Sequence, residues 1–508
     1  MTRLPRLGAV CALSLALAAC GLTRPPASVE APTPARWNAP LPDAALPHAG
    51  SLPSLATWWR DAGDPVLAEL IEAAQAASPN IASAATRIAE ARATRVQTGA
   101  ALAPNLDGVL SATRSNSPTS GVGGGVGTTG ASGTTGATGG STSIPPVTIG
   151  QAGLQSSWEI DLFGGLRAGR DAAASRLDAS SAQWHEARVS VAAETANAYF
   201  AERACARQLA VAESDTRSRL DSARLTDLSA QAGFTAPADA ALARAGAADA
   251  SGRLKQQRAQ CQVLRQGLVA MTGLDAAELA RKLDAQPGEL ALPAMHPVDQ
   301  VPARTLAQRP DVYAAEQAVA AASADVGAAQ AQRYPRLSLT GNIGRLQIRT
   351  GGFRETLDSW SIGPVQLTVP IFDGGTRAAN AESARARYDE AVVKYRASVR
   401  NAVKEVEEAL VNLQSTDARS ADADSAVRNY QASFDATEAR YRSGLASQFE
   451  LEDARRTLFA AQTARVGLQR ERATAWVSLY RALGGGWSRP EAQAAATPEP
   501  QATPVARP

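Results

Sequence analysis

Two long runs of the chain contain neither glycine nor proline, one in each half. They extend from Arg170 to Ala232 and from Thr376 to Ser443. Glycine and proline interrupt helices more strongly than any other residues, and both runs are rich in the helix-favouring Ala, Arg, Glu and Leu. Each run therefore predicts one continuous helix, roughly 90–100 Å long at 1.5 Å per residue.

Both predicted helices carry apolar residues at alternating steps of three and four, which predicts packing against neighbouring helices. In the second run the series is unbroken: Val392, Tyr395, Val399, Ala402, Val406, Ala409 and Leu413. In the first it contains Val189, Ala192, Ala196 and Tyr199, is interrupted at Arg203, and resumes at Ala206 and Ala210. A plain coiled coil fits the helices alone equally well.

The two halves repeat one unit at an offset of about 210 residues. Phe163-Gly164-Gly165 resembles Phe372-Asp373-Gly374-Gly375, Gly233 matches Gly444, and Gly273 matches Gly484. The predicted units are 57–300 and 301–486. The first contains a hairpin at about 104–162, the long helix at about 167–232 and a return helix at about 238–272. The second contains a helix at about 311–333, a hairpin at about 335–371, the long helix at about 376–443 and a return helix at about 445–483.

The residues before each long helix alternate between apolar and polar, which predicts strands with one apolar face. Leu154, Trp158, Ile160 and Leu162 alternate with polar residues that include Gln155, Glu159 and Asp161. Val365, Leu367, Val369 and Ile371 alternate with Gln366 and Thr368. The polar face suits a water-filled lumen and the apolar face suits lipid, although a soluble sandwich fits any one strand. Four strands in two hairpins cannot close a barrel, so other copies of the chain are expected to complete it. A Gly/Ser/Thr-rich insertion, Ser115 to Ser143, falls in the first hairpin loop.

The chain begins with features of a bacterial lipoprotein signal. Arg3 and Arg6 precede a short apolar stretch, Ala9 to Ala19, and Cys20 follows two alanines. This pattern predicts a signal peptide at 1–19 and lipid on Cys20, with an ordinary secretory leader as the alternative. An aspartate directly after the lipidated cysteine would favour retention in the inner membrane. Gly21 stands there instead, which fits a protein of the outer membrane. Residues 20–56 are predicted to be a Pro/Ala-rich tether and 487–508 a disordered tail.

The composition argues against several classes of function. Lys and Arg total 51 against 49 Asp and Glu, so nucleic acid is not an expected partner. The three histidines, His48, His185 and His296, form no metal-ligand spacing with cysteine. No phosphate-binding loop, dinucleotide fingerprint or nucleophile elbow is present. We expect no enzyme activity, no metal and no cofactor apart from covalent lipid on Cys20.

Several motifs together resemble the TolC-like outer membrane efflux proteins, particularly their NodT-type lipoprotein branch. These motifs are Trp58-Trp59 with Asp64-Pro65 and Leu67; Ser157-Trp158-Glu159-Ile160-Asp161-Leu162-Phe163-Gly164; Arg309-Pro310-Asp311-Val312 with Ala315-Glu316; Tyr334-Pro335 with Leu337 and Leu339; Pro370-Ile371-Phe372-Asp373-Gly374-Gly375; and Tyr441-Arg442-Ser443-Gly444. The resemblance implies an α+β membrane protein that forms a homotrimer. Each chain would give four strands to a twelve-stranded outer-membrane barrel, continuous with a helical barrel in the periplasm. The resemblance also implies an exit duct that works with a periplasmic adaptor and a proton-driven inner-membrane pump.

The resemblance assigns roles to residues where the helices turn back. It implies adaptor docking by Gly233, Phe234 and Thr235 and by Gly444, Leu445 and Ala446, against the alternative of simple structural turns. It also implies an aperture gate formed by Glu450, Asp453 and Tyr441. A ring of these carboxylates in a trimer would favour cations and raise carboxylate pKa values by repulsion. Solvated acids on a helix face are the alternative. Ala446 stands where the family has a polar gating residue, so part of the family's hydrogen-bonded latch is not carried over.

Cys205 and Cys261 lie equally far from Gly233 on its two sides. A hairpin centred on that glycine places them at the same height on neighbouring helices, so a disulfide is expected in the oxidising periplasm. Two other functions fit parts of the pattern. One is a protein-secretion duct of the same architecture, and the other is a structural coiled-coil lipoprotein without a pore.

Overall fold

The structure is a computed structural model that describes residues 24–39, 58–60, 63–115, 146–285 and 306–489. Cys20, the predicted signal peptide, nearly all of the Gly/Ser/Thr insertion and the tail from residue 490 lie outside the described residues. The chain divides into two units, each considered by itself below. The long helices α5 (Gly165–Gln231) and α10 (Thr376–Arg442) contribute residues to both.

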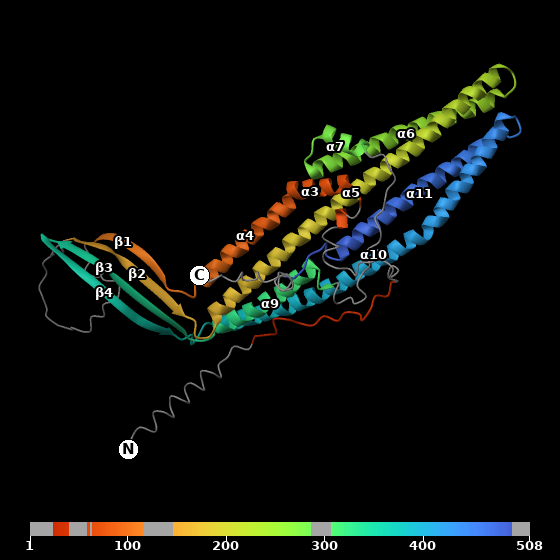
Figure 1. Cartoon of the computed structure of the whole chain (residues 1–508). Helices are drawn as coiled ribbons and strands as arrows, with labels where there is room; N and C mark the ends of the chain where they lie inside the picture. The colour runs from red at the N-terminus through yellow and green to blue at the C-terminus, as the bar shows by residue number, and fades with distance from the viewer. Residues whose placement is uncertain (1–23, 40–57, 61–62, 116–145, 286–305, 490–508) are drawn as a thin grey trace, which may run out of the picture. The chain divides into compact units, whose positions relative to one another are not determined.

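The first unit contains a four-stranded antiparallel sheet in the order β1-β2-β3-β4 (Figure 1). The strands are β1 (Asn105–Ser115), β2 (Val147–Ile160), β3 (Arg336–Thr350) and β4 (Phe353–Thr368). The register is continuous except for an irregularity between Leu339 and Gly341, opposite β4. β1 and β4 are therefore the edges of the sheet in a single chain.

The remaining helices include α3 (Pro65–Ala77), α4 (Pro79–Ala100), α6 (Pro237–Thr272), α7 (Ala276–Asp284), α9 (Pro310–Ala331) and α11 (Gln448–Ala482). Both halves contain a helix, two strands, a 67-residue helix and a return helix in the same order. Most of these elements begin and end within a few residues of the sequence prediction. α3 and α7 were not predicted.

The second unit has an aromatic and aliphatic core where α3, α5, α10 and α11 meet. Trp58 stacks on Trp476 with ring centroids 4.8 Å apart, and Trp59 packs against Tyr480 at 4.5 Å. The prediction that the apolar series on each long helix packs against neighbouring helices is confirmed in this region, because most residues of both series are buried. The buried members are Val189, Ala192, Ala196 and Tyr199 on α5, and Val399, Ala402, Val406, Ala409 and Leu413 on α10.

Asp64, which belongs to the motif that begins with Trp58-Trp59, connects the start of α3 to this core. Its side chain accepts hydrogen bonds from the backbone N–H groups of Val66 and Leu67, and Pro65 occupies the first helical position. The Tyr199 hydroxyl donates to the same carboxylate. Burial, together with this hydrogen bond, raises the pKa of Tyr199. The motif therefore caps α3 and fixes it against α5.

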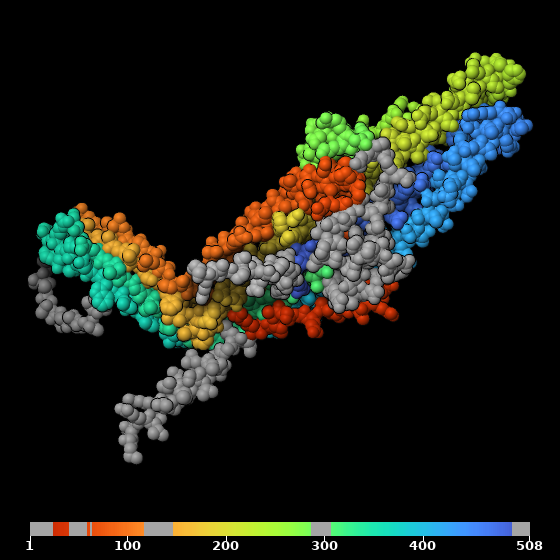
Figure 2. Space-filling model, viewed as in Figure 1, coloured from red at the N-terminus to blue at the C-terminus, as the bar shows by residue number. Residues whose placement is uncertain are grey.

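The described part of the predicted tether packs on the helices. Pro25 and Pro26 accept hydrogen bonds from Ser323 and Tyr388 in the first unit. In the second unit, the Glu407 carboxylate accepts the backbone N–H groups of Asn38 and Ala39, each at 2.7 Å. Trp37 and Ala39 are buried, and Figure 2 shows this red segment against the helices. Residues 24–39 therefore follow a defined path.

Candidate functional site

In the half of the sheet next to the helices, one face is apolar and exposed in the single chain. Cross-strand pairing places Leu154 beside Ile343, and Ile343 beside Trp360, while Ile160, Leu337 and Leu367 share another row. The large exposed residues on this face are Leu106, Leu110, Leu154, Ile343, Trp360, Ile362, Val365 and Leu367. Contiguous apolar surfaces of this kind mark contact with a partner or with lipid.

The opposite face is polar over the same half of the sheet, whereas Ile149, Leu346, Ile348 and Leu357 lie on it further from the helices. Gln155 lies opposite Asp107 and Asn342, and Glu159 lies opposite Ser338, whose other neighbour is Gln366. Thr368 continues the same face at the end of β4. Four of the five predicted lumen residues therefore share one face.

Asp161 corrects the sequence prediction, because β2 ends at Ile160. Its carboxylate accepts the backbone N–H groups of Leu166 and Arg167, so it serves the start of α5. Asp373 does the same before α10, where the backbone N–H of Arg377 is the main cause of its lowered pKa. β4 likewise ends before Val369 and Ile371, which were predicted on the strand; Pro370 has no N–H to continue a ladder.

Two turns, one in each half, join the long helices to their return helices. Gly233 and Gly444 have φ values of +80° and +74°, a left-handed conformation that favours glycine. The backbone N–H of Phe234 donates to Ser229, and that of Leu445 donates to Arg440, as in a Schellman turn. Phe234 is 86% exposed and Leu445 is 71% exposed. Both turns thus present a large apolar side chain to the surroundings.

The predicted gate residues lie just beyond the second turn. Glu450 forms a reciprocal capping box with Ser447 at the start of α11 and approaches Arg440 at 3.9 Å. Hydrogen bonds from the backbone and side chain of Ser447 lower the pKa of Glu450 in the single chain. This direction is opposite to the rise expected from a ring of carboxylates. Asp453 pairs with Arg456 at 2.6 Å.

Tyr441 contacts the other long helix. Its hydroxyl lies 3.1 Å from the hydroxyl of Thr226, a buried residue on α5. The contact joins α10 to α5 close to both turns, so the two turns lie at the same end of the second unit, as Figure 1 also shows.

A buried polar network beside the predicted gate residues was not predicted from the sequence. Arg455 on α11 donates to the hydroxyls of Ser218 and Ser222 on α5, at 3.0 and 2.9 Å. Glu452 accepts from Arg455 and from Arg219, which also pairs with Asp215. Burial lowers the pKa of Arg455. The available signal was the spacing of Ser218, Ser222 and Thr226, which places three hydroxyls on one face of α5.

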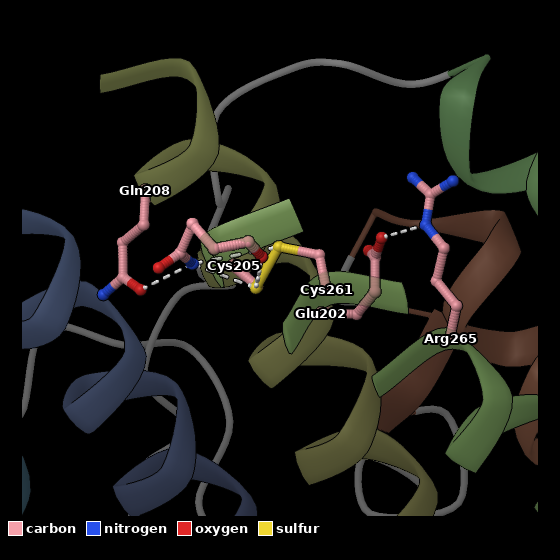
Figure 3. The surroundings of a disulfide bond; sticks show 6 residues. Glu202, Cys205, Gln208, Cys261 and Arg265 are labelled. Carbon is pink, nitrogen blue, oxygen red and sulfur yellow. Dashed lines mark hydrogen bonds and ion pairs between the residues drawn. A yellow bond between two sulfur atoms is a disulfide. The ribbon is translucent and has the colours of Figure 1, made fainter. Parts of the chain in front are cut away.

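The two cysteines are joined by a disulfide between α5 and α6, with their Cα atoms 5.6 Å apart (Figure 3). Both are buried. One turn earlier on α5, the buried Glu202 accepts from Arg265 of α6 at 2.8 Å, and Arg265 also pairs with Asp284 at the end of α7. A covalent link and a buried ion pair therefore hold α5 and α6 together at one level.

Within the described ranges, no group of three or more His, Cys, Asp or Glu is placed to hold a metal ion. None of the helices in the described part of the chain has both the length and the apolar character to cross a membrane.

Comparison with known proteins identifies clear relatives. Residues 70–274 and 301–485 match the model of the family described as outer membrane efflux protein. The chain is 33% identical to the pyoverdine export outer membrane protein OpmQ of Pseudomonas putida over 95% of this chain and 98% of OpmQ. It is 30% identical to the solvent efflux pump outer membrane protein SrpC of Pseudomonas putida, covering 84% and 86% of the two chains. The solved outer-membrane channel OprN superposes with a TM-score of 0.76 at 27% identity, over 92% of this chain and 99% of OprN.

Proposed function

Because the chain belongs to the outer membrane efflux protein family and is an efflux channel of the outer membrane, we propose that three copies form one exit duct of a tripartite pump. The observation that carries this proposal is the two-faced half of the sheet next to the helices, which has an exposed apolar face and an opposite polar face. Such a sheet suits a wall between lipid and water.

The edges of the sheet support assembly from several chains. Within the described part of the chain, β1 and β4 each have a neighbouring strand on one side only. Backbone groups at such edges cannot stay unpaired in lipid. We place β1 of one copy beside β4 of the next, so that three copies close a twelve-stranded barrel. The repeated order of helices and strands would give each copy two similar halves around the duct. Lipid on Cys20 would add a second attachment to the outer membrane.

We assign the two turns to docking of a periplasmic adaptor, which connects the duct to an inner-membrane, proton-driven pump. Phe234 and Leu445 carry this assignment because both are large, apolar and exposed at the end of the helices. Thr235 and Ala446 follow them in the same turns, and Gly233 and Gly444 set the turn geometry.

Truncating both apolar side chains, Phe234→Ala with Leu445→Ala, is expected to reduce efflux strongly while leaving the channel itself intact. Loss of two anchors of this kind weakens binding at least about tenfold. The measurement is ethidium accumulation in a strain that lacks the native gene. Val263→Ala is the matched control, because Val263 is equally exposed on α6 but far from the turns. Normal efflux by the double variant would remove these residues from docking.

We assign the aperture to Glu450, Asp453 and Tyr441, with the Arg455 network as the junction that holds α11 against α5. The two carboxylates are half-exposed in the single chain and can therefore line a shared opening while each is paired with an arginine. The junction is buried and consists of charged hydrogen bonds, which resist the separation of α11 from α5.

Two double variants separate the charge of the gate from its closure. Glu450→Ala with Asp453→Ala removes the capping box and two ion pairs, so single-channel conductance is expected to rise. Glu450→Gln with Asp453→Asn preserves side-chain size and a capping partner, so it is expected mainly to reduce cation selectivity. Both are measured in planar bilayers, with Glu471→Gln as a control remote from the turns. Unchanged conductance and selectivity in both would refute the gate assignment.

We propose that the exported compounds are small molecules. OpmQ is named for pyoverdine export and SrpC for solvent efflux, so a pyoverdine-like compound and an organic solvent are the two cargoes to compare. A strain that lacks the gene should lose either secretion of its pyoverdine-like compound or tolerance of toluene, and the plasmid-borne gene should restore it. A strain unaffected in the export of any small molecule would contradict the proposed function.

A further inference from the structure

A row of three arginines crosses the sheet at the end remote from the helices. The register places Arg114 opposite Thr148, Thr148 opposite Arg349, and Arg349 opposite Arg354. One residue from each strand therefore lies in this row, and three of the four are arginine. We call Arg114, Arg349 and Arg354 the arginine row. All three are exposed.

The arginine row lies on the side of the sheet that is apolar near the helices. Side chains alternate along a strand, so residues separated by an even number share a face. Arg114 is four residues from Leu110, Arg349 is six from Ile343, and Arg354 is six from Trp360. The ladder is regular over this part of the sheet, so the three arginines stand on the same side as Leu110, Ile343 and Trp360.

No carboxylate neutralises the row among the described residues. Arg349 donates to the neutral Gln347 at 2.7 Å, and none of the three arginines forms an ion pair there. Glu355 follows Arg354 but pairs with Ile348 on the opposite face. The sequence from Ser115 to Trp158, which includes the whole first hairpin loop, contains no charged residue. That loop cannot supply the missing charge.

Arg345 provides a contrast on the same face. It lies opposite Asp358 and forms an ion pair with it at 2.7 Å. Arg349 and Arg354, by comparison, lie directly opposite each other. Like charges in this position destabilise a sheet unless an anion lies between them. Two guanidinium groups side by side present paired donors that match the oxygens of a phosphate.

The height of the row indicates the source of the phosphate. The all-apolar row of Ile160, Leu337 and Leu367 marks the helix-proximal end of this face. This face becomes polar at the Arg345–Asp358 pair, about 26 Å further along β2 at 3.3 Å per residue, or about 20 Å for a strand tilted by about 40°. The arginine row lies four residues beyond that pair, about 30 Å from the helix-proximal row in a tilted strand, and therefore just outside an apolar band about 25 Å tall. Arginine on a lipid-facing surface is tolerated at the interface and costly at the midplane.

We propose that the arginine row binds the phosphate groups of a phosphorylated lipid in the outer leaflet of the outer membrane. This inference rests on the proposed function, which places the sheet across that membrane with its helices on the periplasmic side. The apolar rows nearer the helices, around Leu154, Ile343 and Trp360, would contact the acyl chains of the same lipid, and Arg349 with Arg354 would hold a phosphate between them.

Binding of lipid A to the purified full-length protein in detergent tests the proposal. The probes are bisphosphorylated lipid A and the same lipid with its phosphates removed. Arg349→Gln with Arg354→Gln is expected to weaken binding of the phosphorylated lipid about thirtyfold, because each basic residue near an anionic surface contributes about a factor of five. Arg349→Lys with Arg354→Lys should bind with intermediate affinity. Arg345→Gln with Asp358→Asn is the matched control, since it removes an ion pair from the same face without changing net charge.

Equal binding of the two lipids by the wild-type protein would overturn the proposal, and this comparison requires no variant to fold. So would unchanged binding by the glutamine variant. Full competition by inorganic phosphate at millimolar concentration would show a free-anion site instead of a lipid site. Conductance in phospholipid bilayers separates this inference from the proposed function. Channels with normal conductance but no phosphate-dependent lipid binding would overturn only the arginine row, whereas a wild-type protein without channel activity would overturn the proposed function.

Discussion

Replacing Cys205 and Cys261 with alanine is expected to lower the free energy of local unfolding of the α5–α6 hairpin by about 2–4 kcal/mol. The disulfide closes a loop of 56 residues that includes the whole turn at Gly233. In the chain-entropy description, a loop of this length is worth about 4 kcal/mol, and residual helix in the opened hairpin reduces that value. Alanine is preferred to serine because both sites are buried and a hydroxyl would lack a partner.

Hydrogen exchange of backbone amides near residue 261 measures this effect directly. Protection should fall in the double variant and in the wild-type protein treated with a reductant. The reductant should have no effect on the double variant, which is the internal control. Equal protection in wild-type and variant proteins would show that helix packing and the Glu202–Arg265 pair suffice without the covalent link.

Arg309→Met is expected to destabilise the second unit by about 3–5 kcal/mol, since removing one partner of a buried ion pair leaves the other charges uncompensated. The Arg309 side chain is only 6% exposed. It donates to Asp311 and Glu405, each at 2.7 Å, and to the carbonyl oxygen of Ala482 at 3.0 Å. One guanidinium therefore joins the start of α9, the middle of α10 and the end of α11.

Thermal unfolding followed by helical circular dichroism provides the measurement. Arg309→Lys should be intermediate, because an ammonium keeps the charge but not the planar fork that reaches three acceptors. Arg419→Met is the control: Arg419 pairs with Glu471, both side chains are 50% exposed, and such pairs contribute at most about 1 kcal/mol. A melting temperature for Arg309→Met equal to that of the control would contradict the proposed role of this cluster.

The long helices could be predicted closely because their signal is local. α5 and α10 end next to the glycines that the sequence marks, and the spacing of Val406, Ala409 and Leu413 identifies a buried face. The extent of β4 could not be predicted in the same way. It begins at Phe353, well before the clear alternation around Val365, because pairing with β3 extends it through a mixed sequence.

The residues of the candidate site also fall into those that local sequence spacing predicts and those that only packing places. Gly233, Gly444 and the cysteine pair could be placed from spacing alone, since a helical hairpin fixes which residues share a height. The buried junction of Arg455 could not, because 100 of the 508 residues are charged and only packing decides which of them are enclosed. Asp161 was assigned to the lumen because alternation does not show where a strand stops and a helix cap begins.

Single-channel recording from the purified full-length protein tests the central claim most directly. We expect discrete, uniform channels in planar bilayers, formed by a species whose mass in detergent corresponds to three chains and which dissociates on heating. A folded protein that remains a single chain and produces no channels would contradict it.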